Sequence, residues 1–240
     1  MNYRPRHPHH RPAPTGFTLV ELMVSVVIVA VLATLGAVVA NSVKVRAQEA
    51  RCLSNLRNIG VALHLHAQDH GGRFPETSHT VSLDRAWIES LRPYLGDYDE
   101  IRICPADPRA NERLEAGGTS YILNSFIFVP EVNAWGETVG PALNRPAAIP
   151  DASRTLLAFV CSDRIGAGPG NDHTHSNLWG SWSGVCSDIA PSRFGGSDDR
   201  LAADGRSNYL YADGRVESIR AATLKQKTDS GINIAQPPGL

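Results

Sequence analysis

The chain has 240 residues and a formal net charge of −1, and 42% of its residues are hydrophobic and 20% charged. This is ordinary globular composition, and the length predicts one folded domain plus an anchor rather than two full domains. The balanced charge argues against a basic nucleic-acid-binding protein and against an acidic disordered tail.

The chain contains four cysteines, Cys52, Cys104, Cys161 and Cys186. They are too few for a disulfide-dense scaffold, and the lack of a C-x-x-C pair argues against a zinc knuckle or a thioredoxin motif. In an exported domain they permit two disulfides in three pairings, and the sequence alone does not choose among them.

Residues 1–16 form a short segment that contains arginine, proline and histidine and no acidic residue. Its four prolines make a poor helix, so we expect a leader that is removed by processing. An alternative interpretation is a metal-binding tract built from His7, His9 and His10.

Residues 17–40 form a long apolar run whose only charge is Glu21. As a helix this run is roughly 36 Å long, enough to cross a hydrocarbon core of about 30 Å. The arginines of the leader precede it, so the positive-inside rule places the N-terminus in the cytoplasm, although basic residues after the span weaken this assignment. Glu21 costs roughly 2.5–3.5 kcal/mol inside a membrane, so it either has a partner or lies at the membrane edge among headgroups.

The sequence GFTLVE at Gly16–Glu21 resembles the cleavage and methylation motif of type IV prepilins and type II secretion pseudopilins. The shared pattern is a basic leader ending in glycine, an aromatic residue, an acid five residues into the mature chain, and a long apolar run. The resemblance implies that prepilin peptidase cuts between Gly16 and Phe17 and methylates the new amine. Glu21 would then pair with the amine of Phe17 in a neighbouring subunit and set the register of a filament.

The same resemblance implies a single-pass protein of the bacterial inner membrane with its head in the periplasm. It also implies partnership with other pilin or pseudopilin subunits and with the peptidase.

Residues 41–70 continue the helix as an amphipathic segment with one apolar stripe, and Gly71-Gly72 is a natural stop. His66 and His70, spaced i, i+4, could share a metal ion, but surface histidines are the preferred interpretation because no H-E-x-x-H pattern accompanies them. The stripe predicts that the outer half of one long helix packs on a globular head, residues 71–226. Its apolar positions are Ala50, Leu53, Leu56, Gly60, Leu63 and Ala67.

Three short stretches resemble a subgroup of pilin-like proteins: RCLSNLR after the anchor, Cys-Pro-x-Asp at 104–107 and Ser-Tyr-x-x-Asn at 120–124. The subgroup ends in a His, nine residues and Asp-Gly. Here Asp213-Gly214 is present, but Ala203 stands at the His position, so Asp213 is expected to be a hairpin residue. Within this resemblance Cys52 and Cys104 suit a disulfide that ties the helix to the head, with two buried free thiols as the alternative.

The head is expected to be rich in strands, and no βαβ alternation appears. The fold class is therefore α+β and pilin-like: a long N-terminal helix, transmembrane and then amphipathic, packed on a small antiparallel sheet. The expected elements are a short helix at 82–95 with Ser82 as N-cap, a strand end at 101–104, strands at 120–129 and 155–161, and a hairpin at 208–219. The tail, 227–240, is expected to be disordered.

Residues 162–200 are too long for a simple connection, so they are a functional or variable loop. The preferred interpretation is a loop folded on its own side chains, stapled by Cys161 and Cys186 if they pair. Weaker hypotheses assign it ligands: sugar or protein contact through Trp179 and Trp182, calcium through Asp198 and Asp199, or oxygen and nitrogen ligands from Asp172, His173 and His175.

The leading functional hypothesis is a structural filament subunit with no chemistry, cofactor or resident metal of its own. The alternative is a membrane-tethered periplasmic protein that binds carbohydrate or another surface ligand through the 162–200 loop. An enzyme is not expected, because no G-x-S-x-G, H-E-x-x-H, P-loop or G-x-G-x-x-G motif appears.

Overall fold

The computed structural model describes residues 16–131, 133, 135, 137, 139 and 142–240. It divides into two compact units, residues 1–43 and residues 44–240. All of the leader except Gly16 lies outside the described residues. The predicted long helix is confirmed: α1 runs from Leu19 to Asp69 over 51 residues.

The first unit is built from the apolar N-terminal part of α1. Its described side chains are exposed, including Phe17 at 80% and Val29 at 65%. Its most apolar 18-residue window has a mean hydropathy of 2.8. By length and composition, the helix can therefore cross a membrane.

In the second unit, α1 from residue 44 onward is amphipathic, as predicted. Its buried residues recur at spacings of three and four, and they lie in the main hydrophobic cluster of the head. They include Cys52, Leu56, Ile59, Leu63 and Ala67. The helix ends at the predicted glycine pair, where Gly71 and Gly72 have φ of 64° and 77°.

A four-stranded sheet in the order β1-β2-β3-β4 forms the centre of the head. All three pairings are antiparallel, which confirms the α+β, pilin-like fold class. The predicted hairpin is present, and Gly214 takes φ 85° in its turn. The strands are β1 (Tyr121–Leu123), β2 (Leu156–Val160), β3 (Arg206–Tyr211) and β4 (Val216–Arg220).

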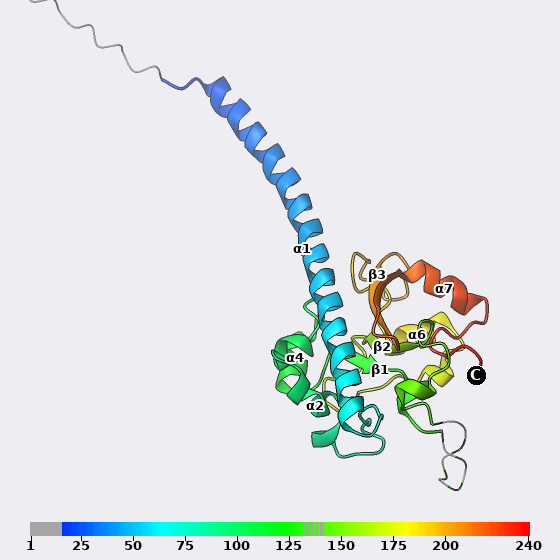
Figure 1. The fold of residues 1–240 in the computed structure, drawn as a ribbon. Coiled ribbons are helices and arrows are strands. Elements are labelled where there is room, and N and C mark those ends of the chain that lie inside the picture. Colours follow the sequence, from blue (N-terminus) through cyan, green and yellow to red (C-terminus); the bar gives the residue numbers. More distant parts are fainter. Residues whose placement is uncertain (1–15, 132, 134, 136, 138, 140–141) are drawn as a thin grey trace, which may run out of the picture. The chain divides into compact units, whose positions relative to one another are not determined.

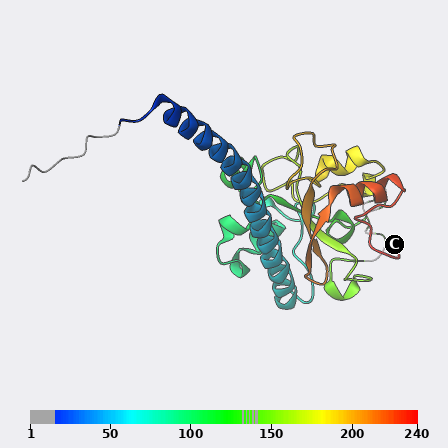
Figure 2. The same cartoon turned by 90° about the horizontal axis from the view of Figure 1, so that it is seen from above.

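Both faces of the sheet are buried. One face belongs to the cluster that contains the α1 residues, while the other packs with α6 (Trp182–Asp188) and α7 (Ala221–Asp229). Neighbouring residues of β3 alternate between the clusters, Leu210 toward α1 and Tyr209 toward the opposite side. Figures 1 and 2 both show the cyan part of α1 on one side of the sheet and α7 on the other.

Helix and sheet approach each other closely at Gly60. A Cβ atom at this position would lie 2.8 Å from Cδ1 of Leu210 on β3. The glycine in the predicted apolar stripe therefore permits close packing of α1 on the sheet.

Three of the predicted elements differ in the structure, and short helices occupy their place. The segment 82–95 is broken into three short helices, and the side chain of Ser82 makes no capping hydrogen bond. The segment 101–104, where a strand end was expected, contains no strand: it begins with the last residue of a helix, α3, and continues as irregular backbone. The strand expected at 120–129 stops at Leu123, because Asn124 Oδ1 accepts the N–H of Phe126 at 3.1 Å and starts α5. These short helices are Leu83–Arg85 (3₁₀), α2 (Trp87–Ser90), Arg92–Tyr94 (3₁₀), α3 (Tyr98–Ile101), α4 (Ala110–Glu115), α5 (Ser125–Phe128), Pro146–Ala148 (3₁₀) and Ser176–Leu178 (3₁₀).

The tail, 227–240, differs from the predicted disordered segment. Helix α7 continues to Asp229, and Ala235 is buried with only 1% of its surface exposed. Two side-chain amides hold the tail: Asn233 donates to the carbonyl of Ser176 at 2.6 Å, and Asn124 donates to the carbonyl of Ala235 at 2.7 Å. These contacts are long-range, so local composition did not indicate them.

Candidate functional site

The start of α1 is a reciprocal cap between Thr18 and Glu21. One carboxylate oxygen of Glu21 accepts the backbone N–H of Thr18 at 2.9 Å and its hydroxyl at 2.8 Å. In return, the hydroxyl oxygen of Thr18 accepts the N–H of Glu21 at 3.2 Å. The sequence T-x-x-E thus forms a capping box that fixes the helix start directly after the Gly16-Phe17 bond.

The predicted processing and assembly residues therefore lie at the start of an exposed apolar helix, Gly16 and Phe17 just before it and Glu21 in its first turn. Gly16 and Phe17 precede the helix in non-helical backbone, and both are exposed. A protease can approach such a segment more readily than a helical one, because the peptide bond is not tied into a helix ladder.

The comparisons with known proteins bear on this segment. A family model described as the prokaryotic N-terminal methylation motif matches residues 13–37. The N-terminal segment thus carries the motif that type IV pilin-like proteins share. The match includes the Gly16-Phe17 bond and Glu21, and the head lies outside it. No curated protein and no solved structure matches the chain.

The head brings Cys52 and Cys104 together. The two thiols are hydrogen-bonded to each other, and this contact together with burial raises the pKa of Cys104. The hydroxyl of Tyr121 lies 3.6 Å from Sγ of Cys52. All four cysteines are buried and none forms a disulfide in the structure, so the disulfides remain predictions.

Asn55, in the stretch that resembles the subgroup, ties α1 to the segment before Cys104. Its side-chain amide donates to the carbonyl oxygens of Glu100 and Ile103, each at 3.0 Å. The helix is thus fixed to the head by polar contacts as well as by its apolar stripe.

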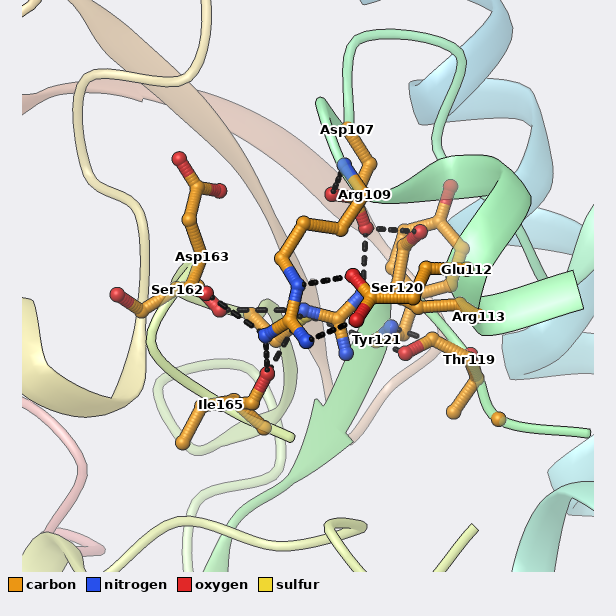
Figure 3. A network of polar contacts seen from close by, with 12 residues as sticks. Asp107, Arg109, Glu112, Arg113, Thr119, Ser120, Tyr121, Ser162, Asp163 and Ile165 are labelled. Carbon is orange, nitrogen blue, oxygen red and sulfur yellow. Dashed lines mark hydrogen bonds and ion pairs between the residues drawn. The ribbon is translucent and has the colours of Figure 1, made fainter. Parts of the chain in front are cut away.

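The Cys-Pro-x-Asp element supplies a buried ion pair. Asp107 Oδ2 accepts Nε of Arg113 at 2.7 Å and the hydroxyl of Ser120 at 2.6 Å, with both charged side chains at most 1% exposed. Arg113 also donates to the carbonyl oxygens of Ser162 and Ile165 (Figure 3). The network joins α4, the residue just before β1 and the start of the 162–200 loop, so its role is structural.

The prediction that Trp179 and Trp182 present flat faces to a ligand is wrong. Trp179 is 4% and Trp182 8% exposed, and both belong to the cluster on the outer face of the sheet. Their ring N–H groups are also used: Trp179 donates to Asp188 at 2.8 Å, and Trp182 donates to the carbonyl of Leu201 at 2.9 Å. The 162–200 loop folds on its own side chains, and these tryptophans are part of its core.

The predicted calcium ligands do not converge. Asp199 Oδ1 accepts the N–H of Leu201 at 2.9 Å within its own turn. Across the described residues, no group of three or more His, Cys, Asp or Glu side chains is arranged to hold a metal ion.

His173 and His175 of the 162–200 loop line a pocket of about 350 Å³. A third histidine, His79, which the sequence analysis did not predict, lines it with them. His79 reaches it from the loop after α1, and its Nε2 lies 2.9 Å from Nε2 of His173. Partial desolvation lowers the pKa of the largely exposed His79, and the neighbouring His173 acts in the same direction, which favours the neutral ring. His173 in turn donates from Nδ1 to Asp172 at 2.7 Å.

Sequence reasoning missed two residues of these sites. Thr18 carried a recognisable signal, since T-x-x-E before an apolar run is a capping box. His79 carried none, because it is a single histidine in a polar loop and lies 94 positions before His173 in the chain.

Proposed function

We propose that the chain is a structural subunit, a prepilin or pseudopilin, of a type IV pilus-like or type II secretion-like filament. Prepilin peptidase cuts it between Gly16 and Phe17 and methylates the new amine. The observation that carries the proposal is the Thr18–Glu21 cap at the start of an exposed apolar helix, within residues that match the methylation motif.

The cap explains how the subunit is stored before assembly. A carboxylate in a membrane is costly, and hydrogen bonds from a backbone N–H and a hydroxyl offset part of that cost. Glu21 therefore has local partners while the subunit is a monomer in the membrane.

Assembly replaces lipid with neighbouring helices around the same apolar surface. The side chains of residues 17–34 are exposed in the isolated chain, so they need either lipid or other helices around them. In a filament, the carboxylate of Glu21 pairs with the amine of Phe17 in an adjacent subunit, a charge pair strengthened by the low dielectric.

In this role the subunit spans the membrane once and acts by packing alone. The leader is cytoplasmic, α1 crosses the bacterial inner membrane once, and the head lies in the periplasm or in the filament. The chain contributes packing and has no catalytic activity of its own.

The first test is the mature N-terminus, measured by mass spectrometry of the protein extracted from membranes of a host with prepilin peptidase. A chain that starts at methylated Phe17 is expected. A chain that retains Met1, or is cut elsewhere, contradicts the proposal.

The second test separates processing from assembly. Glu21→Ala should be processed but should not enter sheared filaments, whereas Ser25→Ala, one turn further along α1, should assemble as the wild type does. Normal assembly of the Glu21 variant would rule out its pairing role.

A further inference from the structure

The pocket lined by His79 and His173 has a geometry that the filament role does not use. The two rings come from segments 94 positions apart, and their Nε2 atoms face each other at 2.9 Å. The ring planes meet at 65°, and both residues line the same pocket.

The buried carboxylate of Asp172 fixes the tautomer of the His173 ring. Asp172 is fully buried, and its Oδ1 accepts Nδ1–H of His173 at 2.7 Å. The same carboxylate accepts the N–H of Ser78 at 2.7 Å and its hydroxyl at 2.9 Å, so it is held in place. Because the proton of His173 is on Nδ1, its Nε2 presents a lone pair to the pocket.

We propose that His79 and His173 bind a divalent transition-metal ion of the zinc class through their Nε2 atoms. Zinc–nitrogen bonds of about 2.0–2.1 Å in a tetrahedral arrangement place two ligand nitrogens roughly 3.4 Å apart. The rings need to separate by only about half an ångström to reach this distance. His79 is exposed, so it can make that adjustment without disturbing the core.

Two protein ligands leave coordination positions open. His175 lines the same pocket with Asn171; its side chain is 63% exposed, and its Nδ1 lies 3.6 Å from Oδ1 of Asp188. Its ring centroid lies 5.4 Å from that of His173, so it is the candidate third ligand. Water completes the shell, which makes the site an open one rather than a closed structural zinc site.

A second histidine pair in the head provides a matched comparison. The rings of His66 and His70 are stacked at 3.9 Å with an interplanar angle of 5°. Their lone pairs lie in parallel planes and do not converge on one ion. This pair should contribute nothing to binding at the proposed site.

The test uses the full chain in detergent, without a polyhistidine tag and with His7→Ala, His9→Ala and His10→Ala in the leader. Zn²⁺ binding is measured by titration calorimetry, and Co²⁺ is added separately for its visible spectrum. One ion per chain with nitrogen ligation is expected. His79→Ala should weaken binding at least tenfold, and Asp172→Asn, which removes the carboxylate behind His173, by about 10–100-fold.

Control variants separate metal binding by this pair from a plain hydrogen bond between the two rings. His66→Ala combined with His70→Ala should leave affinity and stoichiometry unchanged. If the two rings share only a hydrogen bond, the chain binds no ion up to about 1 mM Zn²⁺, and the proposal fails. It fails equally if His79→Ala, folded by circular dichroism, binds as the parent does. His79→Ala decides the outcome even if variants at the buried positions do not fold, because this side chain is exposed.

Discussion

Asn124 and Ala235 are joined across 111 positions by a hydrogen bond of 2.7 Å from the side-chain amide to the carbonyl oxygen. The same amide donates to the carbonyl of Leu156 at 2.7 Å, and Asn124 is fully buried. Asn124→Ala should therefore remove this donor from two buried carbonyl groups. We expect a loss of about 1–3 kcal/mol in the free energy of unfolding, measured by urea titration.

A control for this prediction lies on α1. Asn58 is exposed, so Asn58→Ala should change the free energy of unfolding by less than about 0.5 kcal/mol. If Asn124→Ala were as mild as Asn58→Ala, the tail would contribute nothing to the stability of the head.

Cys52 and Cys104 are adjacent in the core, so we expect them to form a disulfide in an oxidising compartment. The bond should stabilise the head by about 2–4 kcal/mol. Non-reducing mass spectrometry of the exported protein should find this pair, and Cys52→Ser should lower the melting temperature only in the absence of reductant. Free thiols at both positions in the exported protein would show that the pair is structural and reduced.

Cys161 and Cys186 should lower the free energy of unfolding of the head at alkaline pH. Burial raises the pKa of Cys161 to about 12 and that of Cys186 to about 11, from 9.0. The unfolded chain releases these protons near pH 9, while the folded chain retains them. The stabilisation is therefore complete below about pH 9 and is lost as the pH rises toward 11–12.

The measurement compares urea midpoints at about pH 8 and about pH 9, because unfolded thiols ionise in this range whereas tyrosines, with a pKa near 10, ionise mostly above it. The fall should be smaller in Cys161→Ser, which lacks one of the two thiols. Both thiols should also resist alkylation until the chain unfolds. An equal fall in the variant would assign the effect to other groups.

The parts of the fold that the sequence predicted are those with local causes. The long helix follows from an unbroken apolar run and a glycine stop, and the hairpin follows from alternating residues around Asp213-Gly214. The processing motif is likewise contiguous, and the match to residues 13–37 covers it.

The parts that failed depend on contacts between distant segments. Trp182 looked suited to an exposed face, but its burial depends on a carbonyl partner at Leu201 and on the neighbouring sheet. The tail looked disordered because its anchors, Asn124 and Ser176, lie far back in the chain. His79 and His173 meet only through the fold, so no spacing rule could pair them.

The buried pair of Asp107 and Arg113 provides the sharpest test of the subgroup-like elements in the head. Both charges are removed from water, and Arg113 also donates to the carbonyl of Gly166 at 2.8 Å, so its guanidinium is fixed in place. Asp107→Ala leaves this cation buried without a counter-charge. We expect a loss of about 3–5 kcal/mol in the free energy of unfolding, by urea or thermal denaturation.

An exposed pair on the same helix is the matched control. Glu112 bonds to Arg109 on the surface of α4, with the Glu112 side chain 57% exposed. Glu112→Ala should therefore cost less than about 1 kcal/mol. Asp107→Ala combined with Arg113→Met should cost less than the sum of the single changes, because the second change removes the unpaired cation. Additive losses would mean that the two side chains stabilise the head independently rather than as a pair.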